Sequence, residues 1–239
     1  MALVVENAAD DPAGPLGDWL TDAGLTVEVV RPYAGDPLPV GLDAIDALVV
    51  LGGAMSAYDE DSVAWLAPLK GLLREAVGTG LPVLAICLGA QLLADATGGR
   101  VGPAGDQTEV GPGLVAKRDG AVADPLFGPL PFTPDVLQWH HDAVTELPPG
   151  AELLAASPRC VNQAFRIGER AWGVQFHIET TPDVVRGWAT AEAGYLADNG
   201  IDLEKLLAQV ETTHPDLQEV WAPVVGRFAD LTRRDAEVR

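Results

Sequence analysis

The stretch Leu81-Pro-Val-Leu-Ala-Ile-Cys-Leu-Gly-Ala-Gln-Leu-Leu-Ala94 places a cysteine between a predicted strand and a predicted helix. Its first six residues are apolar and uncharged, which is typical of a strand covered on both faces. Apolar residues then recur at helical spacing (Leu88, Leu92, Leu93 and Ala96), and Gly98-Gly99 end the helix. We therefore expect Cys87 at the carboxyl end of a central strand.

This position has two interpretations. Free N–H groups at a helix start favour a thiolate, and Gly89 lets the backbone pass close to a bound molecule. A strand, a nucleophile and a helix in this order form a nucleophile elbow. A lone cysteine is, however, most often a buried and inert one. The stretch alone does not decide between a reactive and an inert Cys87.

The first half of the chain alternates predicted strands with predicted helices. Strands are expected at 2–5, 25–29 and 46–51, and helices at 16–20 and 63–77, the second capped by Asp61-Ser62. This order predicts a parallel sheet covered by helices on both sides, with ligands bound at the carboxyl ends of its strands. Gly52-Gly53 follows one such strand end.

The second half is less regular. Residues 101–149 are rich in proline and glycine and contain short strand-like pieces at 113–116 and 134–139. The histidines of Trp139-His-His-Asp142 lack a third ligand at suitable spacing, so we expect no metal and place one histidine near the rim of the site. Further strands are predicted at 152–156, 164–167 and 171–177. A helix opening at Thr181 or Pro182 and two more helical stretches follow, and the charged end, 233–239, is expected to fray.

Composition excludes several classes of function. The formal net charge of −20 over 239 residues argues against binding to nucleic acid or to anionic membranes. Two cysteines, Cys87 and Cys160, are too few for a disulfide framework. There is no apolar run of transmembrane length and no signal-peptide pattern, so we expect a soluble, cytoplasmic protein.

The pair His177-Ile-Glu179 supplies a candidate base for Cys87. On a continuing strand, residues two apart face the same way, and a histidine that activates a thiol needs a carboxylate to orient its ring. The same pair also fits a surface histidine and glutamate at a strand end. Gly52-Gly53 can turn a backbone N–H toward a developing oxyanion, and the N–H of Leu88 would be the second donor.

Three separated segments occur in the order and approximate spacing of the class I (triad) glutamine amidotransferases. They are Gly52-Gly53, Ala85-Ile-Cys-Leu-Gly-Ala-Gln91 and Gly173-Val-Gln-Phe-His-Ile-Glu179. The chain most resembles the glutaminase domain of GMP synthetase and its stand-alone relatives, and Asn162-Gln-Ala-Phe165 adds to the likeness. It departs from the family at Ile178, where proline is usual.

The resemblance implies an α/β fold: a three-layer, flavodoxin-like, mostly parallel sheet with a short-strand insertion and extra C-terminal helices. It implies an amidotransferase domain over residues 1–197 and a C-terminal helical extension over 198–239, packed on the same domain. No metal and no organic cofactor are implied. The sequence shows no P-loop, so either a separate synthetase subunit receives the ammonia or none does. The oligomeric state is not indicated.

The resemblance also implies roles for particular residues. Cys87 attacks the side-chain amide of glutamine, His177 acts as base and then acid, and Glu179 orients His177. A γ-glutamyl thioester forms and is hydrolysed. The N–H groups of Gly53 and Leu88 form the oxyanion hole, and the substrate is contacted by Gly52, Gln91, Gln163, Phe165 and His140.

Three alternatives stay open. The first is a γ-glutamyl hydrolase or peptidase that uses the same triad on other γ-glutamyl compounds. The second is a non-catalytic regulatory or binding protein that retains the fold, against which the complete set of Cys87, His177 and Glu179 argues. The third is a different cysteine-elbow family, in which Glu6 would be the acidic partner of the cysteine. The His-x-Glu strand disfavours it.

Overall fold

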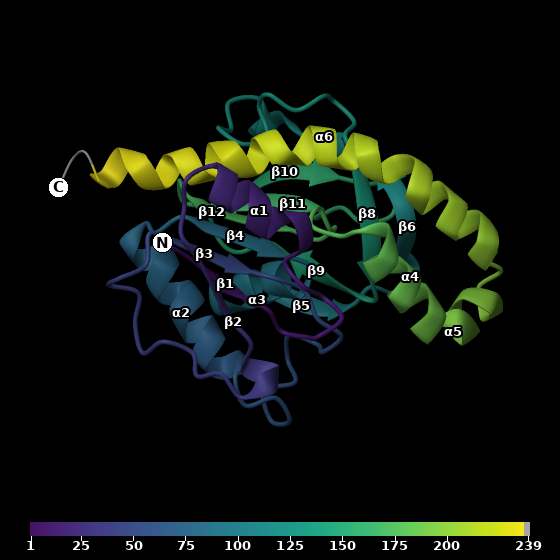
Figure 1. Cartoon of the computed structure of the whole chain (residues 1–239), viewed down its shortest axis with the longest axis horizontal. Coiled ribbons are helices and arrows are strands. Elements are labelled where there is room, and N and C mark those ends of the chain that lie inside the picture. Colours follow the sequence, from purple (N-terminus) through teal and green to yellow (C-terminus); the bar gives the residue numbers. More distant parts are fainter. Residues whose placement is uncertain (237–239) are drawn as a thin grey trace.

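The computed structural model describes residues 1–236, with side chains through Thr232. Its centre is a sheet of eight strands in the order β2-β1-β3-β4-β12-β11-β10-β7 (Figure 1). The parallel part comprises β1 (Ala2–Val5), β2 (Val27–Val30), β3 (Ala47–Val50), β4 (Val83–Ile86) and β12 (Ala171–Val174). The order 2-1-3-4 is that of flavodoxin-like sheets, as expected.

The other three strands extend the sheet in antiparallel fashion beyond β12. They are β11 (Ala164–Ile167), β10 (Glu152–Ala156) and β7 (Ala116–Lys117). The strands β1, β3, β4 and β12 are buried along their whole length. Their unbroken apolar sequences follow from this, because a sheet covered on both faces has no position at which a polar side chain reaches water.

Helices cover both faces of the sheet (Figure 1). On one face, α1 (Gly14–Asp22) and α6 (Leu203–Ala236) pack in the same apolar cluster as Val4 and Val49. On the other face, α2 (Leu66–Thr79) and α3 (Leu88–Ala96) pack in a second cluster with Leu3 and Leu48. Alternate strand residues thus enter opposite layers, which gives the predicted three-layer arrangement.

The proline- and glycine-rich region forms two antiparallel pairs. One joins β5 (Arg100–Pro103) to β9 (Asp142–Glu146), and the other joins β6 (Glu109–Leu114) to β8 (Asp135–His140). The predicted piece at 134–139 corresponds to β8, whereas the piece at 113–116 falls across the end of β6 and the start of β7, and the strands β5 and β9 were not predicted. Short 3₁₀ turns lie at Pro32–Ala34, Gly105–Gln107 and Asp119–Ala121. The insertion thereby lies against the carboxyl ends of the parallel strands.

The C-terminal helices differ from the expectation. The helix expected after Thr181 is divided at Glu192 into α4 (Pro182–Ala191) and α5 (Ala193–Asp198). The two later stretches are one helix, α6, which contains Pro215 and Pro223. Burial of its apolar face, including Trp221, against α1 and the sheet offsets the hydrogen bonds lost at the prolines. The expected frayed end is helical over 233–236, and 237–239 lie outside the described residues.

Two local predictions are wrong. The second helix begins at Leu66 rather than after Asp61-Ser62. Trp65 is its cap residue, and the Ser62 hydroxyl instead donates to the carbonyl of Asp59 in the preceding turn, at 3.1 Å. The last parallel strand ends at Val174, so His177 and Glu179 do not lie on a continuing strand.

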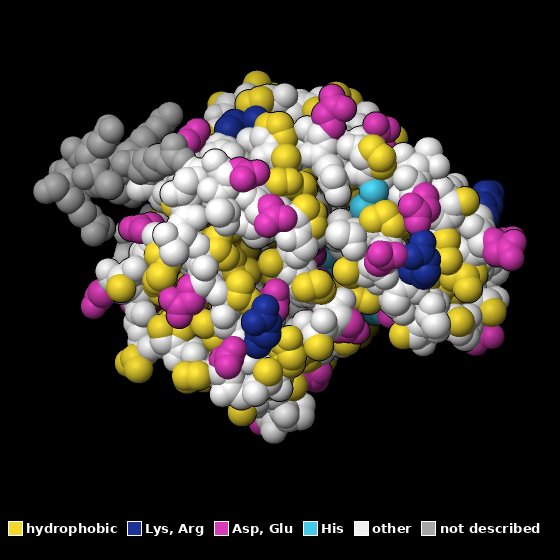
Figure 2. Space-filling model, viewed as in Figure 1, with side chains coloured by type: hydrophobic (Ala, Val, Ile, Leu, Met, Phe, Trp, Pro, Cys, Tyr) yellow, Lys and Arg dark blue, Asp and Glu magenta, His cyan; other side chains and the backbone are white. Residues whose placement is uncertain are grey.

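The surface agrees with the composition. Acidic side chains are scattered over the face shown in Figure 2, with few lysines or arginines among them, as 35 acidic against 15 basic residues require. Within residues 1–236, no helix is both long enough and apolar enough to cross a membrane.

Candidate active site

Cys87 lies in the connection between β4 and α3, as predicted. Its φ of 50° makes it the single non-glycine residue in the described chain with a left-handed backbone. Its N–H donates to the carbonyl of Val174 at 2.8 Å, and its carbonyl accepts from the N–H of Gln91 at 3.0 Å. Such a backbone costs about 1–3 kcal/mol and persists where the surroundings fix it, most often at a functional site.

Gly89 allows a close contact, but not with a bound molecule. A Cβ added there would lie 2.1 Å from the carbonyl oxygen of Val50 on β3. The glycine therefore lets α3 begin directly against the neighbouring strand. This corrects the expectation that Gly89 makes room for a ligand.

His177 and Glu179 meet through a local turn rather than a strand. The backbone of His177 forms a bridge to Leu137 of β8, donating at 2.8 Å and accepting at 3.3 Å. His177 Nδ1 lies 2.6 Å from Glu179 Oε1, while the other carboxylate oxygen accepts the N–H of Ile178 at 2.8 Å. Because a carboxylate only accepts, Nδ1 carries the proton and Nε2 is left for another partner.

Cys87 is a further neighbour of His177: the two residues line the same pocket, and Cys87 contributes to the raised pKa of His177. Both His177 and Glu179 are almost fully buried. Burial lowers the pKa of His177, but the negative charges of Glu179, Cys87 and Asp11 outweigh it and hold that pKa well above its usual value. An imidazolium facing a sulfur is thus the favoured state of the pair.

Asp11 also lies in this cluster, although the sequence did not single it out. Its Oδ1 is 4.0 Å from His177 Nδ1, and this buried oxygen has no hydrogen-bond partner in the described chain. Burial raises the pKa of Asp11 to about 7; His177 lowers it and Glu179 raises it further. A proton on Asp11 removes one of the two carboxylate charges beside the imidazole.

Gly52 makes room for this cluster. A Cβ there would lie 2.1 Å from Asp11 Oδ2 and 3.0 Å from His177 Cε1. Gly52 is not among the residues that line the pocket beside Cys87. Its position explains why this residue is glycine without any contact to substrate.

Gly53 lies against the side chain of Leu88. A Cβ on Gly53 would lie 3.2 Å from a side-chain carbon of Leu88 and 3.0 Å from the sulfur of Met55. Gly53 lines the pocket, and Leu88 is the first residue of α3. The loop is anchored by Asn7, whose side-chain N–H donates to the carbonyl of Leu51 at 2.8 Å.

A pocket of about 280 Å³ opens over Cys87 and His177. This volume is at the small end for ligand sites and suits a compact molecule of amino-acid size. Of the predicted substrate contacts, Gln91 and His140 line it. The sequence missed most of the remaining wall, which is formed by Asp10, Asp11, Ala54, Met55, Ser56, Trp139, His141, Asp142, Trp188, Ala191 and Glu192.

The indole rings of Trp188 and Trp139 form part of this wall. Trp188 packs over His177 with ring centroids 4.8 Å apart, and its indole N–H donates to the carbonyl of Asp10 at 2.7 Å. Trp139 lies 5.7 Å from Trp188, between ring centroids. Both residues belong to apolar patterns that, in sequence, are indistinguishable from ordinary packing.

Gln163 and Phe165 lie outside the pocket lining. Phe165 is buried against Gly173, where a Cβ would come within 2.4 Å of its ring. Gln163 donates from Nε2 to Glu109 Oε2 at 2.6 Å. The contacts of both residues are internal to the protein.

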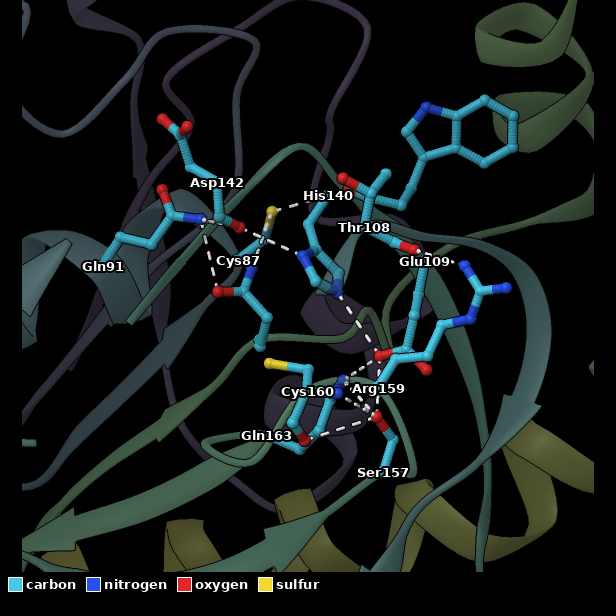
Figure 3. Close-up of polar contacts among 12 residues, drawn as sticks. Cys87, Gln91, Thr108, Glu109, His140, Asp142, Ser157, Arg159, Cys160 and Gln163 are labelled. Atoms are coloured by element: carbon cyan, nitrogen blue, oxygen red, sulfur yellow. Dashed lines mark hydrogen bonds and ion pairs between the residues drawn. The ribbon is translucent and has the colours of Figure 1, made fainter. Parts of the chain in front are cut away.

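A chain of polar contacts runs from Cys87 into the protein (Figure 3). Gln175 Nε2 lies 3.7 Å from Cys87 Sγ, and the side-chain oxygen Oε1 of Gln175 accepts from Gln91 Nε2 at 3.3 Å. Gln91 also donates to the carbonyl of Asp142 at 3.1 Å, and the same carbonyl lies 3.0 Å from His140 Nδ1. Gln91 therefore orders the pocket wall as well as lining it.

Two groups of side chains carry atoms of the kind that bind metals. One is Asp11, His177 and Glu179, and the other is Glu109, His140 and Cys160. Cys160 is buried, and burial raises the pKa of its thiol to about 11, with a smaller rise from Glu109 and an opposing backbone hydrogen bond from Asn162. Sequence spacing did not reveal Glu109 and Cys160 as neighbours of His140, because they lie on other segments.

Comparison with known proteins gives a consistent result. Residues 16–186 match the model of the family described as glutamine amidotransferase class-I. A glutamine amidotransferase-like protein of Salmonella typhimurium, YfeJ, is 31% identical over 197 residues, covering 81% of this chain and 82% of that protein. A glutamine-hydrolyzing GMP synthase of Thermomicrobium roseum is 38% identical over 159 residues, covering 66% of this chain but only 28% of that protein.

Solved structures agree over nearly the whole chain. A glutamine amidotransferase of Thermotoga maritima superimposes with a TM-score of 0.84 at 27% identity, covering 95% of this chain and 97% of that one. A second, from Methylobacillus flagellatus, gives a TM-score of 0.85 at 28% identity and covers 97% and 94% of the two chains. With its flavodoxin-like sheet and its matched family model, this chain belongs to the class I glutamine amidotransferases.

Proposed function

We propose that this chain hydrolyses the side-chain amide of glutamine, with Cys87 as nucleophile, His177 as base and acid, and Glu179 as the residue that orients His177. The observation that carries the proposal is the buried His177–Glu179 contact of 2.6 Å beside a cysteine held in a left-handed backbone. Family membership supports amide hydrolysis in general, and this geometry supports the particular residues.

The proposed acylation uses these three side chains and two backbone N–H groups. The sulfur of Cys87 attacks the amide carbon, and the amide oxygen takes the negative charge, stabilised by the N–H groups of Gly53 and Leu88. The C–N bond then breaks as His177 gives its proton to the leaving nitrogen, which departs as ammonia. The product is a γ-glutamyl thioester on Cys87.

Deacylation reverses the roles. Water occupies the place left by ammonia, His177 takes a proton from it, and the oxygen attacks the thioester carbon. The C–S bond breaks and glutamate leaves with Cys87 regenerated. Glu179 holds the His177 ring in one tautomer throughout, which the 2.6 Å hydrogen bond supports.

Substrate contacts are proposed for Gln91 and His140, both of which line the pocket. Gly52, Gln163 and Phe165 were expected to contact the substrate as well. Their surroundings support an indirect role, in which Gly52 leaves space for Asp11 and His177, and Gln163 and Phe165 hold the strands behind the pocket. We also propose the division into an amidotransferase domain (1–197) and a helical extension (198–239).

An acceptor for the ammonia is a further part of the proposal. The matched GMP synthase of Thermomicrobium roseum is much longer, since this chain spans 28% of its length. We propose that glutamine is the substrate and that a separate synthetase subunit takes the ammonia.

A second candidate is a γ-glutamyl hydrolase acting on amides of larger amines. The pocket wall favours it in one respect: four carboxylate residues (Asp10, Asp11, Asp142 and Glu192) line it, with no lysine or arginine among the lining residues. A γ-glutamyl substrate whose amine portion is positively charged fits this acidic wall better than one whose amine portion is negatively charged.

Steady-state kinetics separate the two candidates. Ammonia release from glutamine is compared with amine release from γ-glutamyl amides of a diamine, an alkylamine of equal length and an amino acid. Hydrolysis of glutamine that is lost in Cys87→Ser supports the first candidate. If glutamine is not hydrolysed while a γ-glutamyl conjugate is cleaved, the proposed glutaminase activity is rejected and the γ-glutamyl hydrolase is supported. If neither reacts, with and without synthetase subunits, the catalytic proposal fails.

A further inference from the structure

Behind the pocket, three side chains of different chemistry converge from three segments. Glu109 on β6 and His140 on β8 are register partners, and Cys160 lies in the turn between β10 and β11. One ligand-type atom from each lies within 4.8 Å of the other two. The turn is fixed by Ser157, whose hydroxyl accepts the N–H of Cys160 at 2.9 Å.

His140 uses Nδ1 for a hydrogen bond elsewhere, so its Nε2 is left to face this group. Nδ1 lies 3.0 Å from the carbonyl of Asp142, which can only accept, so Nδ1 carries the proton. In the neutral ring Nε2 then has a free lone pair. It is buried, has no hydrogen-bond partner in the described chain, and faces Glu109 Oε2 at 3.7 Å (Figure 3). The lone pairs of His140 Nε2 and Glu109 Oε2 face each other away from water, and such an arrangement is unfavourable unless a positively charged group lies between them.

The surrounding contacts are those of a prepared metal ligand set. A histidine ligand typically donates its other N–H to a carbonyl, as His140 does, and a carboxylate ligand is typically hydrogen-bonded in turn. Glu109 Oε2 accepts from Ser157 Oγ at 2.7 Å and from Gln163 Nε2 at 2.6 Å. The buried Oε1 of Gln163 has no partner in the described chain and is available as a fourth donor.

We propose that Glu109, His140 and Cys160 bind a zinc ion. Sulfur, imidazole and carboxylate ligands in a buried, small group are those of tetrahedral zinc. Binding replaces the thiol proton of Cys160, which passes to solvent, with a sulfur–zinc bond. The two charges of Zn²⁺ are then balanced by the thiolate and the Glu109 carboxylate, with His140 neutral, so the buried site carries no net charge.

The ion would stabilise the wall of the pocket. His140 holds the carbonyl of Asp142, which also accepts from Gln91, and Gln91 contacts Gln175 beside Cys87 (Figure 3). Zinc bound to Nε2 would fix the His140 ring and thereby the hydrogen bond from Nδ1 to the carbonyl of Asp142. The role is structural, because no atom of the site belongs to the proposed triad.

The test uses the full chain without an affinity tag, in the Cys87→Ser background, where Cys160 is the remaining cysteine. We expect one equivalent of Zn²⁺ to survive dialysis, and X-ray absorption to show one sulfur at about 2.3 Å. Co²⁺ in its place should give a thiolate-to-cobalt charge-transfer band. Because these readouts need no variant at Cys160, they do not depend on whether such a variant folds.

Glu109→Gln should weaken Zn²⁺ binding by more than about tenfold. Glu204→Gln, an exposed carboxylate on α6, is the matched control and should leave it unchanged. The proposal is overturned if no metal is retained, if the zinc shell contains no sulfur, or if both variants bind equally. In that case the group of Glu109, His140 and Cys160 is an internal cluster of side chains that holds no zinc. None of these measurements involves amide hydrolysis, so the glutaminase proposal stands or falls separately.

Discussion

The surroundings of Cys87 and Cys160 contain the same residue types in different arrangements. Each buried cysteine has a histidine and a glutamate beside it: His177 and Glu179 in one case, His140 and Glu109 in the other. Cys87 lies at the start of a helix and lines the pocket, whereas Cys160 lies in a turn and does not. The difference shows that backbone position and access, rather than neighbouring residue types, separate a nucleophile from a ligand or an inert thiol.

The histidines differ as well. His177 donates from Nδ1 to a carboxylate and lines the pocket together with Cys87, and nearby negative charge holds its pKa well above the usual value. His140 donates from Nδ1 to a backbone carbonyl, and its Nε2 faces Glu109 Oε2 at 3.7 Å, within the group around Cys160 rather than the group around Cys87. We therefore assign proton transfer to His177 alone.

Replacing each histidine by alanine in a separate variant tests this assignment, and the His177 variant has the largest expected effect of the changes considered. His177→Ala should lower kcat/KM for glutamine by about 10²–10⁴-fold, the usual contribution of a general base. His140→Ala should lower it less, mainly through KM, because it removes pocket wall and not the base. The measurement is initial-rate ammonia release on variants with matched circular dichroism. A larger loss in His140→Ala would move the base to that residue.

Two glycines, Gly89 in the elbow beside Cys87 and Gly113 on β6 of the insertion, test how tightly these two regions are packed. Gly89→Ala should destabilise the protein by about 3 kcal/mol or more, because its Cβ would lie 2.1 Å from a backbone oxygen of β3. Gly113→Ala on β6 is the matched control, since its Cβ would meet Gln138 at an ordinary 3.6 Å. Urea unfolding measures both. Equal losses would mean that the elbow is no more constrained than the insertion.

Asp11 tests the electrostatics on the Cys87 side. Its pKa is raised from 3.8 to about 7, so the folded state holds a proton that the unfolded state releases. Its contribution to stability is therefore greatest below pH 4 and is lost as pH rises to about 7. Asp11→Asn should raise the free energy of unfolding by an amount that grows between pH 4 and 7 and then levels at the order of a few kcal/mol.

The measurement is urea unfolding at pH 4, 5.5, 7 and 8. Asp10→Asn, which changes the exposed neighbouring carboxylate, is the control and should not reproduce the pH-dependent gain. If Asp11→Asn destabilises the protein equally at every pH, Asp11 is ionised in the folded state and its contact with His177 is an ordinary ion pair.

Much of the fold could be predicted from the sequence. The apolar runs within the predicted strands, at 2–5, 47–51 and 81–86, are uncharged, and burial on both faces of a parallel sheet imposes that pattern. The residue at which α2 begins could not be predicted, and neither could the fact that α6 is one continuous helix rather than two. Asp61-Ser62 has the chemistry of a cap but is used in a turn, and tertiary packing overrides Pro215 and Pro223.

The candidate site was predictable where one segment carries the signal. Cys87, His177 and Glu179 lie in short motifs, so the sequence pointed to them directly. Asp11, Trp188 and the group around Cys160 could not be found in this way, because each needs contacts between segments far apart in the chain. Gln163 and Phe165 show the converse, since a motif-based expectation placed them at the substrate and the structure gives them internal contacts.

The contrast between the two cysteines is tested most directly by a chloroketone analogue of glutamine, with the modified peptides mapped by mass spectrometry. We predict stoichiometric labelling of Cys87 at neutral pH, slowed by added glutamine and by His177→Ala, with Cys160 unlabelled. Cys160 lies outside the pocket, and burial raises its pKa to about 11. Equal labelling of both cysteines, or labelling of Cys160 first, would contradict the assignment of Cys87 as the activated nucleophile.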